Sequence, residues 1–486
     1  MATYKSIVSI TQYDVDKQLT VNGWIDTARF SKKTAFIKLY DSWKTHLQPL
    51  QVVFDLTSLS EDTKQELLSV TSGCSITVTG KLVASPKPQQ PFELQASQIK
   101  VLGLISDPGT YPIAKTELSM DYLRSYPHLE CYSVSKSAIY GIRSILIDAI
   151  NIFFLENDFT KCDMPLITFS ECEGGCQPMQ ATLLLTNGTM SDIPVSSDSK
   201  NKIDFTKDFF GRKASLTVSS QLELETQLPL GNVWTMTRAV RGEPSATSRH
   251  LAEFSMLELE MPFIESAKDI IDITEKLIKS CMIYVLGNKY SHTAIEILSK
   301  KFNVDINKQL TRYIREPFIR ITHRDAVTQL LDLHHKGSVT FETLPSYLDD
   351  MSSEHERYLT DVIYKHPVVV TEYPKKVKAF YMPVCGSFNT PDGTQVEYVD
   401  CFDILVPGVG ELVGGSRRIS DYDELLSRIE ELSLDRTQLE FYLELRKYGS
   451  TRHGGMGMGF ERLVKFITCV DSVKDCVTFP RYFKSG

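Results

Sequence analysis

The fold of this chain is decided by the stretch VWTMTRAVRGEPSATSRHLAEFSMLELEM, residues 233–261. Two runs with the composition of β-strands flank a small polar loop at residues 242–248, so the stretch predicts an antiparallel hairpin. Side chains two residues apart in a strand share a face. Phe254 and Glu258 therefore lie on one face of the second arm, and Leu257 lies on the other. We expect the aliphatic face to pack in a core and the polar face to bind a ligand.

The polar side chains of this hairpin are those that nucleotide binding requires. Phe254 offers a platform for a base, Arg241 a donor for a phosphate, and Glu258 a carboxylate for Mg²⁺. Arg249 and His250 add cationic groups at the start of the second arm. A hairpin held together by structural salt bridges is the alternative that this segment alone leaves open.

A second signal is the run GMGMGFERL, residues 455–463. Its alternating glycines Gly455, Gly457 and Gly459 fall on one face of a predicted strand. Glycines weaken a strand unless something must approach its backbone closely, and a flat ring such as adenine would do so. Helical spacing follows, which places Arg462 in a first turn, where it can meet a phosphate beside backbone N–H groups. A glycine-rich packing strand is the alternative, and the pattern is not the G-x-G-x-x-G of dinucleotide-binding folds.

The first hundred residues predict a small β-barrel. A helical stretch at 61–70 accompanies strand-like runs at residues 19–24, 34–39, 50–54, 75–82 and 93–102. Five strands with a helix before the fourth suit a Greek-key barrel such as an OB-fold. The breakers Asp107, Pro108 and Gly109 follow, so we expect the domain boundary there.

The remainder of the chain predicts an α+β domain. Apolar residues lie almost all round a helix expected at 135–156, which is typical of a core helix or of a core helix that also forms a subunit interface. Residues 265–301 have a helical pattern. A helix is expected near 424–431, after strand-like runs at 379–382, 399–406 and 410–413. Strands and helices without regular alternation predict an antiparallel sheet flanked by helices.

Composition bounds the classes of function. The 486 residues suffice for two or three domains, and 42% hydrophobic with 23% charged residues is ordinary for a soluble globular protein. The net charge of −8 lowers the expectation of nucleic-acid binding without excluding a local basic footprint. Ten cysteines without a C-x2-C pair predict reduced thiols and a cytoplasmic location rather than a zinc site. We expect neither a membrane span nor a secretory signal.

Several ordered segments resemble one enzyme family. TSRHLAEF at 247–254 and MGMGFERL at 456–463 resemble motifs 2 and 3 of the class II aminoacyl-tRNA synthetases, in the aspartate/asparagine/lysine subgroup. Further stretches resemble the bacterial-type asparaginyl enzymes, at residues 207–225, 352–359, 378–384, 403–418 and 444–450. The similarity covers essentially the whole chain. It implies a multidomain α+β protein with an OB-fold anticodon-binding domain at 1–105, a hinge at 106–134 and a class II catalytic domain at 135–486.

The resemblance implies roles for the matching positions. Arg241 is expected to hold the α-phosphate of ATP and the amino acid carboxylate, and Arg462 the outer phosphates; these two are the expected catalytic residues. The other expected ATP contacts are Glu243, His250, Phe254, Gly455, Gly457 and Gly459. The expected Mg²⁺ ligands are Glu258 and Glu411. The expected anticodon contacts are Arg29, Phe36, Gln51 and Glu93.

Two positions distinguish asparagine from aspartate as the substrate. The expected amino acid contacts are Glu173, Ser219, Gln221, Glu225 and Arg418. Aspartyl enzymes carry a lysine at the position of Leu224, and that lysine and an arginine matching Arg418 clamp the substrate carboxylate. Here the lysine is missing and Glu225 follows, so an amide would accept from Arg418 and donate to Glu225. This argument fails if Leu224 and Glu225 only continue a solvated strand.

The resemblance also implies partners. They are tRNA(Asn), L-asparagine, ATP with Mg²⁺, and a second copy of the chain, because Pro165 matches the motif 1 proline of the dimer interface. Asp158 stands where glycine is common, so we expect a left-handed turn there. The alternatives are an aspartyl enzyme, including one that charges both Asp and Asn tRNAs, and a non-catalytic RNA-binding paralogue.

Overall fold

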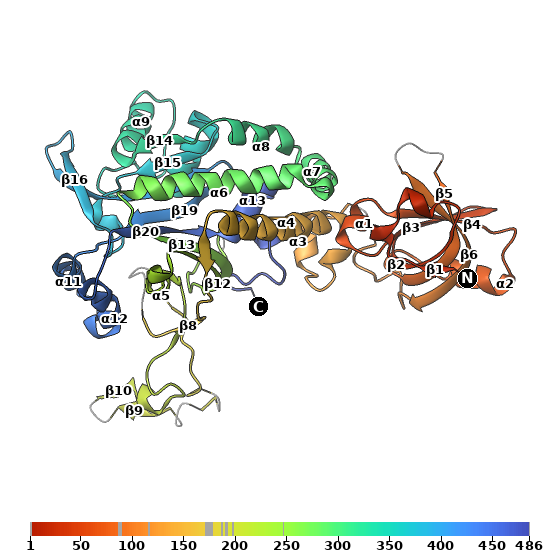
Figure 1. Ribbon diagram of the computed structural model, residues 1–486, viewed down its shortest axis with the longest axis horizontal. Helices are drawn as coiled ribbons and strands as arrows, with labels where there is room; N and C mark the ends of the chain where they lie inside the picture. Colours follow the sequence, from red (N-terminus) through yellow and green to blue (C-terminus); the bar gives the residue numbers. More distant parts are fainter. Residues whose placement is uncertain are drawn as a thin grey trace. The chain divides into compact units, whose positions relative to one another are not determined.

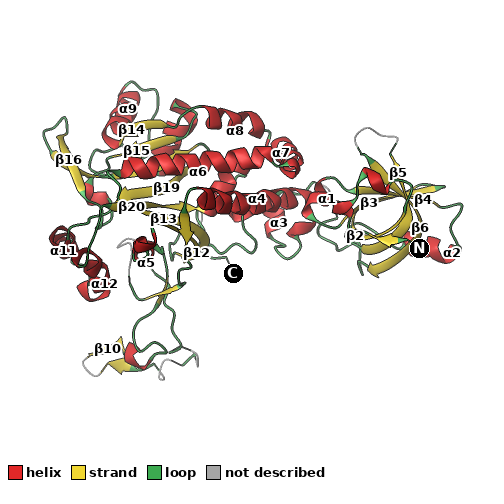
Figure 2. Ribbon diagram, in the orientation of Figure 1, coloured by secondary structure: helices red, strands yellow, loops and turns green. Residues whose placement is uncertain are grey.

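The computed structural model describes residues 2–85, 90–114, 117–170, 178–185, 188–189, 193–196, 199–245 and 247–485 (Figure 1). The chain forms two compact units, Met1–Ile145 with Val285–Ile306, and Leu146–Tyr284 with Asn307–Gly486. Figure 2 shows a β-barrel in the first unit and a large sheet with helices in the second. Each unit is described by itself.

The first unit contains the predicted β-barrel. Its strands follow the order β1-β2-β3-β4-β6-β5, and an additional β2–β5 pairing closes the barrel. The strands are β1 (Thr3–Tyr4), β2 (Gln18–Phe30), β3 (Thr34–Tyr40), β4 (Leu50–Asp55), β5 (Ser75–Ala84) and β6 (Phe92–Gly103). All five predicted strands are confirmed, as is the helix, α2 (Glu61–Leu68). Alternate side chains such as Val21, Ile37 and Val52 are buried inside the barrel, which fixes the register of the strands.

Helix α4 (Val134–Glu156) confirms the helix predicted at 135–156. By length and composition alone it could cross a membrane, but 56% of its most apolar window is buried in the protein, as in a core helix. Ile152 and Leu155 of this helix are 37% and 78% exposed. Asp158, which follows the helix, has a φ of +58°, the left-handed turn expected there. Residues 146–156 of α4 belong to the second unit. The first unit contains the helices α1 (Trp43–Leu47), α3 (Met120–Arg124) and α7 (Lys289–Phe302).

The second unit is built on a sheet of order β14-β15-β18-β19-β20-β13-β12-β7. Its strands are β7 (Phe159–Lys161), β12 (Asn232–Val240), β13 (Glu253–Pro262), β14 (Ile319–Thr322), β15 (Val368–Thr371), β18 (Cys401–Val406), β19 (Gly410–Arg417) and β20 (His453–Gly459). The predicted antiparallel arrangement holds for the central strands, and the edge strands β14 and β7 pair in parallel. The predicted hairpin is β12–β13, and the glycine-rich run is β20 beside it.

Helices cover this sheet. Helix α6 (Ala267–Gly287) packs on β20, since a Cβ added at Gly454 would lie 2.6 Å from Ile270 Cδ1 (Figure 1). The helical stretch predicted at 265–301 is two helices, α6 and α7, because Asn288 caps the start of α7 and accepts from the Tyr290 N–H at 3.0 Å. The other helices are α5 (Gln221–Glu225), α8 (Ile306–Arg315), α9 (His323–His335), α10 (Ser353–Arg357), α11 (Tyr422–Glu431), α12 (Arg436–Lys447) and α13 (Phe460–Thr468).

The prediction of a strand at residues 379–382 is wrong. These residues form a turn, and Phe380 and Tyr381 are buried in a cluster with side chains of α11 and α12 instead of pairing in a sheet. Packing of large aromatic side chains overrides local β-propensity here. A separate hairpin follows, β16 (Val384–Asn389) with β17 (Gln395–Val399). Two short pairs are β8 (Ile167–Thr168) with β11 (Ser215–Leu216) and β9 (Val195–Ser196) with β10 (Ser199–Ile203).

Candidate active site

The candidate site lies on one face of the central sheet. Glu258 of β13, Gly457 of β20, Gly414 of β19 and Asp403 of β18 pair in one row across four strands. Residues paired across antiparallel strands share a face, so two carboxylates flank a floor of two glycines. A Cβ at Gly457 would meet nothing closer than Met256 Sδ at 3.4 Å. The floor is therefore open to a ligand, and a cavity of about 710 Å³ lies over it.

Most of the predicted catalytic-unit residues line this one cavity. They are Ser219, Gln221, Arg241, Glu243, His250, Phe254, Glu258, Glu411, Arg418, Gly457, Gly459 and Arg462. Gly455 and Glu225 are not among its lining residues, and Glu173 lies outside the described residues. Residues that stand far apart in the chain are thus brought to a single site.

Gly455 shares a face with Gly457 and Gly459, as predicted, but a protein group covers it. Gly455 pairs with Glu260 of β13. A Cβ at Gly455 would lie 2.3 Å from Glu260 Oε1 and 2.0 Å from the carbonyl oxygen of Leu259. This glycine makes room for a buried carboxylate, whereas Gly457 leaves room for a ligand.

One wall of the cavity carries the hairpin residues. The Arg241 guanidinium lies 5.5 Å from the centre of the Phe254 ring and donates to the Val218 carbonyl oxygen at 3.3 Å. Glu258 accepts from the Ser219 hydroxyl and, at 3.0 Å, from the backbone N–H of Ser220. These contacts hold the arginine and the carboxylate in place, which favours a preorganised charged site.

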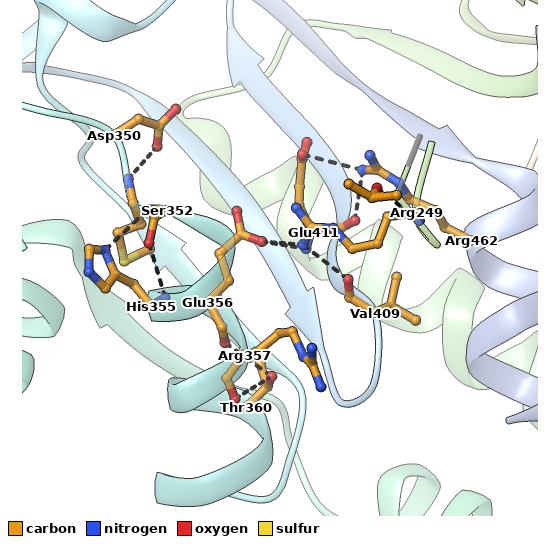
Figure 3. A network of polar contacts seen from close by, with 12 residues as sticks. Arg249, Asp350, Ser352, His355, Glu356, Arg357, Thr360, Val409, Glu411 and Arg462 are labelled. Carbon is orange, nitrogen blue, oxygen red and sulfur yellow. Dashed lines mark hydrogen bonds and ion pairs between the residues drawn. The ribbon is translucent and has the colours of Figure 1, made fainter. Parts of the chain in front are cut away.

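Glu411 of β19 faces the same cavity because of a β-bulge. The pairing of β18 and β19 shifts between Ile404 and Leu405, so that Glu411 stands opposite Leu405. A bulge re-aims the side chains beside it, and this one turns Glu411 to the face of Asp403. Arg462 Nη1 donates to the Glu411 carbonyl oxygen at 2.8 Å and lies 3.3 Å from Oε2 (Figure 3). Burial favours a raised pKa for Glu411, but the charges of Arg462, Lys378 and Arg241 together outweigh burial and lower the pKa.

A partly buried ion pair supports this wall. Arg249 Nη1 lies 2.8 Å from Glu356 Oε2 and donates to the Val409 carbonyl oxygen at 3.1 Å (Figure 3). Glu356 Oε2 also accepts from the backbone N–H of Glu411 at 3.3 Å. Burial and the charge of Glu411 raise the pKa of Glu356. Burial and the charge of Arg462 lower the pKa of His250 below its usual value of about 6.5, which favours a neutral ring at pH 7.

A buried ion cluster stands behind the cavity at Arg418. Arg418 Nη2 lies 2.6 Å from Glu260 Oε1, and Nη1 donates to the Ser416 hydroxyl at 2.6 Å. Its Nε lies 3.6 Å from Glu225 Oε1. Burial raises the pKa of Glu260 to about 7, against the charge of Arg418. The guanidinium that lines the cavity is therefore already paired with protein carboxylates.

Glu225 belongs to the same cluster. Its side chain is fully buried, and it accepts from Arg446 Nη2 and the Tyr442 hydroxyl, each at 2.9 Å. His453 Nε2 lies 2.9 Å from Glu225 Oε2, and Gln221 Nε2 donates to Glu225 Oε1 at 3.1 Å. Burial favours a raised pKa for Glu225, but Arg446 and His453 hold the pKa well below its usual range. The alternative of a solvated strand is wrong, because Glu225 ends helix α5 and is buried.

Comparison with known proteins identifies the family. Residues 119–482 match the tRNA synthetases class II (D, K and N), and residues 19–102 match an OB-fold nucleic acid binding domain. The chain is 40% identical to the asparagine–tRNA ligase of Clostridium tetani over 468 aligned residues. The aligned region covers 96% of the chain and 95% of that relative. The chain belongs to the asparagine–tRNA ligase family of class II synthetases. The expectation drawn from the motifs is therefore confirmed.

Other relatives of this synthetase agree. It is 38% identical over 474 residues to the asparagine–tRNA ligase of Photobacterium profundum, with 97% of the chain and 96% of that relative covered. The asparaginyl-tRNA synthetase of Pyrococcus horikoshii complexed with asparaginyl-adenylate has a TM-score of 0.80 at 28% identity, over 99% of this chain and 98% of that one. The asparaginyl-tRNA synthetase of Entamoeba histolytica has a TM-score of 0.79 at 28% identity, over 100% of this chain and 99% of that one. ATP is a substrate of such synthetases.

The four expected anticodon positions of the synthetase share one face of the barrel. Arg29 pairs with Phe36, and Gln51 pairs with Glu93. Phe36 pairs with Val53, two residues from Gln51, so both pairs project to the same side. The Phe36 ring is 43% exposed. An exposed ring among polar side chains suits the stacking of single-stranded bases, and the assignment to anticodon bases stays a prediction.

The sequence analysis did not predict several charged groups that the structure places at or beside the synthetase site. They are Asp403, Glu260, Glu356, Lys378, Arg446 and His453. Most of them fall in or beside segments that resemble the family, and that resemblance was the only signal available for them. No local spacing connects such residues with Arg241 or Glu258, because their partners lie on other strands and helices.

Proposed function

We propose that this protein activates L-asparagine with ATP, forms asparaginyl-AMP with release of pyrophosphate, and transfers the asparaginyl group to the 3′ end of tRNA(Asn). The relatives named above carry this activity in their names, and two thirds or more of each is covered by the chain. The observation that carries the choice of amino acid is the buried cluster behind Arg418.

Charge balance in that cluster favours a neutral side chain as ligand. Arg446 pairs with Glu225 at 2.9 Å, and Arg418 pairs with Glu260 at 2.6 Å. With Glu260 ionised in its pair with Arg418, the cluster offers hydrogen-bond donors without an excess of positive charge. An amide carbonyl can accept from the Arg418 guanidinium at no net charge. The carboxylate of aspartate would bring an unpaired negative charge into a buried site, which is costly. Gln221 lines the cavity and donates to Glu225, so Glu225 also orients a group that can meet the amide.

The ATP end of the reaction needs positioned charge and no protein nucleophile. The amino acid carboxylate attacks the α-phosphorus, and pyrophosphate leaves. Arg241 is proposed to hold the α-phosphate and the carboxylate together, while Arg462 and His250 contact the outer phosphates. Phe254 would stack on adenine and Glu243 would accept from it. Holding two anions in line and neutralising the charge that develops supplies the catalysis.

Mg²⁺ fits the carboxylates of the cavity. Among the described residues no three Asp, Glu, His or Cys groups gather as a metal cage, and Mg²⁺ at ATP sites is usually held by one or two carboxylates with the substrate phosphates. We propose Glu411 and Glu258 as ligands, as predicted, and add Asp403; Glu258 would hold a separate ion from the other two. Glu258 stands three strands from Asp403, about 14 Å at the usual strand spacing, so Glu411 and Asp403 are the pair that can share one ion. When bound, the ion would neutralise phosphate charge.

The remaining predictions concern assembly and location. A homodimer is supported by α4, which exposes Ile152 and Leu155 shortly before Pro165 in the chain. The anticodon role of Phe36 and its neighbours, and the domain bounds 1–105, 106–134 and 135–486, rest on the resemblance. All cysteines within the described residues are free thiols, in keeping with a cytoplasmic location.

The test is ATP–pyrophosphate exchange by the full chain with each amino acid in turn. Asparagine should support exchange in the presence of Mg²⁺, and aspartate should hardly do so, because its carboxylate would bring an unpaired negative charge into the buried site. Equal or better exchange with aspartate would overturn the choice of asparagine. Silence of folded protein with every amino acid would leave only an RNA-binding role.

A further inference from the structure

Lys378 is a cavity-lining cation without a role in the proposal above. Its Nζ lies 2.7 Å from Asp403 Oδ2 and 3.9 Å from Asp350 Oδ2. The same ammonium lies 3.8 Å from the centre of the buried Tyr373 ring. The side chain of Lys378 is only 12% exposed, and that of Asp403 only 13%. The ammonium is therefore held on several sides by protein groups.

Asp403 and Glu411 each use one carboxylate oxygen to pair with a cationic side chain of the protein. Lys378 meets Asp403 at Oδ2, and Arg462 meets Glu411 at Oε2. The other two oxygens lie over the glycine floor. An ideal Cβ on Gly414 would be 3.5 Å from Asp403 Oδ1 and 3.3 Å from Glu411 Oε1. Both oxygens thus approach a single point above β19, where a Cβ would be in direct contact with both of them.

We propose that Lys378 is a positioning residue for the divalent cation: it holds Asp403 by Oδ2 so that Oδ1 faces Glu411 Oε1 across Gly414. This inference rests on the proposed function, since it assumes a cation with ATP at these carboxylates. Without Lys378, two carboxylates on one face would repel each other, and Asp403 would lose the contact that sets its rotamer. A ligand carboxylate is commonly oriented in this way by a second group that never touches the metal.

A direct contact of Lys378 with a substrate phosphate is the competing role. Lys378 is less suited to it than Arg241 or Arg462, because its ammonium is already compensated by Asp403 at 2.7 Å and approached by Asp350. A phosphate contact would have to compete with that pair. The two roles differ in what removal of the lysine changes: a positioning residue affects the cation, and a phosphate contact affects the nucleotide even without a cation.

The experiment measures Mn²⁺ binding to the full chain by electron paramagnetic resonance, in the presence of a non-hydrolysable ATP analogue. Lys378→Met should weaken Mn²⁺ binding by about 10–100-fold, the usual cost of losing a group that orients a ligand. Lys378→Arg should restore much of the loss. Binding of the analogue in EDTA should be nearly unchanged in Lys378→Met. The matched control is Lys268→Met, which breaks an exposed 2.9 Å lysine–aspartate pair with Asp272 and should leave Mn²⁺ binding as in the wild type.

A double-mutant cycle with Asp403→Asn decides whether the lysine acts through the aspartate. Once Asp403 is gone, Lys378→Met should cost little further Mn²⁺ affinity. Additive losses, or wild-type Mn²⁺ affinity in a folded Lys378→Met, would overturn the inference. Weaker analogue binding in EDTA would overturn it in favour of the phosphate contact. If Lys378→Met does not fold, the comparison of Lys378→Arg with wild type and Asp403→Asn decides in the same way. Absence of Mn²⁺ binding by the wild type would instead refute the proposed cation site itself.

Discussion

Glu225→Gln tests the charge balance behind Arg418. Glutamine keeps the shape of the side chain and removes its charge, so the buried Arg446 guanidinium loses the carboxylate that lies 2.9 Å away. Breaking a buried ion pair by removing one partner typically costs about 3–5 kcal/mol. The free energy of unfolding should fall by about this amount, measured by urea denaturation. Glu444→Gln on the exposed face of α12 is the matched control, and it should change stability little.

The same substitution should change specificity. Glu225 Oε1 lies 3.6 Å from Arg418 Nε, an attraction of about 4–5 kcal/mol at an effective dielectric constant near 20. Without it, Arg418 is more available to a substrate carboxylate. Since about 1.4 kcal/mol is a factor of ten, a third of this attraction would lower the kcat/KM preference for asparagine over aspartate roughly tenfold. Pyrophosphate exchange with both amino acids measures the ratio.

The pH dependence of stability has a definite sign. The pKa of Glu225 is held below its unfolded value of about 4.3. Its contribution to stability is therefore complete above about pH 4.3 and is lost as the pH falls below that value towards the folded pKa. Glu225→Gln should lack this acid-dependent part. An unchanged asparagine preference together with unchanged stability in Glu225→Gln would refute the reasoning.

The remaining predictions concern separate parts of the molecule. Arg241→Ala should abolish pyrophosphate exchange without unfolding the chain, since losing a contact to developing charge costs roughly 3 kcal/mol or more; normal exchange would mean that the hairpin has another role. Phe36→Ala should weaken tRNA charging by about 1–3 kcal/mol and spare exchange, whereas an equal loss of both would make Phe36 structural. Gly457→Ala should keep the fold and raise the KM for ATP, because its Cβ would make only ordinary contacts with the protein, 3.4 Å or longer, on the floor of the cavity, while Gly455→Ala should destabilise by about 1–3 kcal/mol, since its Cβ would lie 2.0 Å from a carbonyl oxygen. Thermal unfolding of the two glycine variants, side by side, checks this contrast.

Local patterns were sufficient for most of the fold. The barrel strands, the β12–β13 hairpin and α4 were predictable because alternation and helical spacing reflect which face of each element is buried. The strand expected at 379–382 failed because its aromatic side chains pack with α11 and α12, which no window of sequence contains. The break between α6 and α7 depends on a single capping residue, Asn288.

The site divides in the same way. The sequence by itself determined the glycine-rich strand that contains Gly457, and the ring, arginine and carboxylate of the hairpin, since these lie at fixed spacings on their strands. Only the structure placed Gly414 beside Gly457 as the second glycine of the floor. Only the tertiary structure decided that a bulge turns Glu411 towards Asp403, and that Glu260 occupies the space over Gly455. It also decided the pairing of Arg249 with Glu356, 107 residues away. Such contacts join residues on different elements, and their burial and charge balance exist only after the sheet has assembled, so no periodicity in the chain records them.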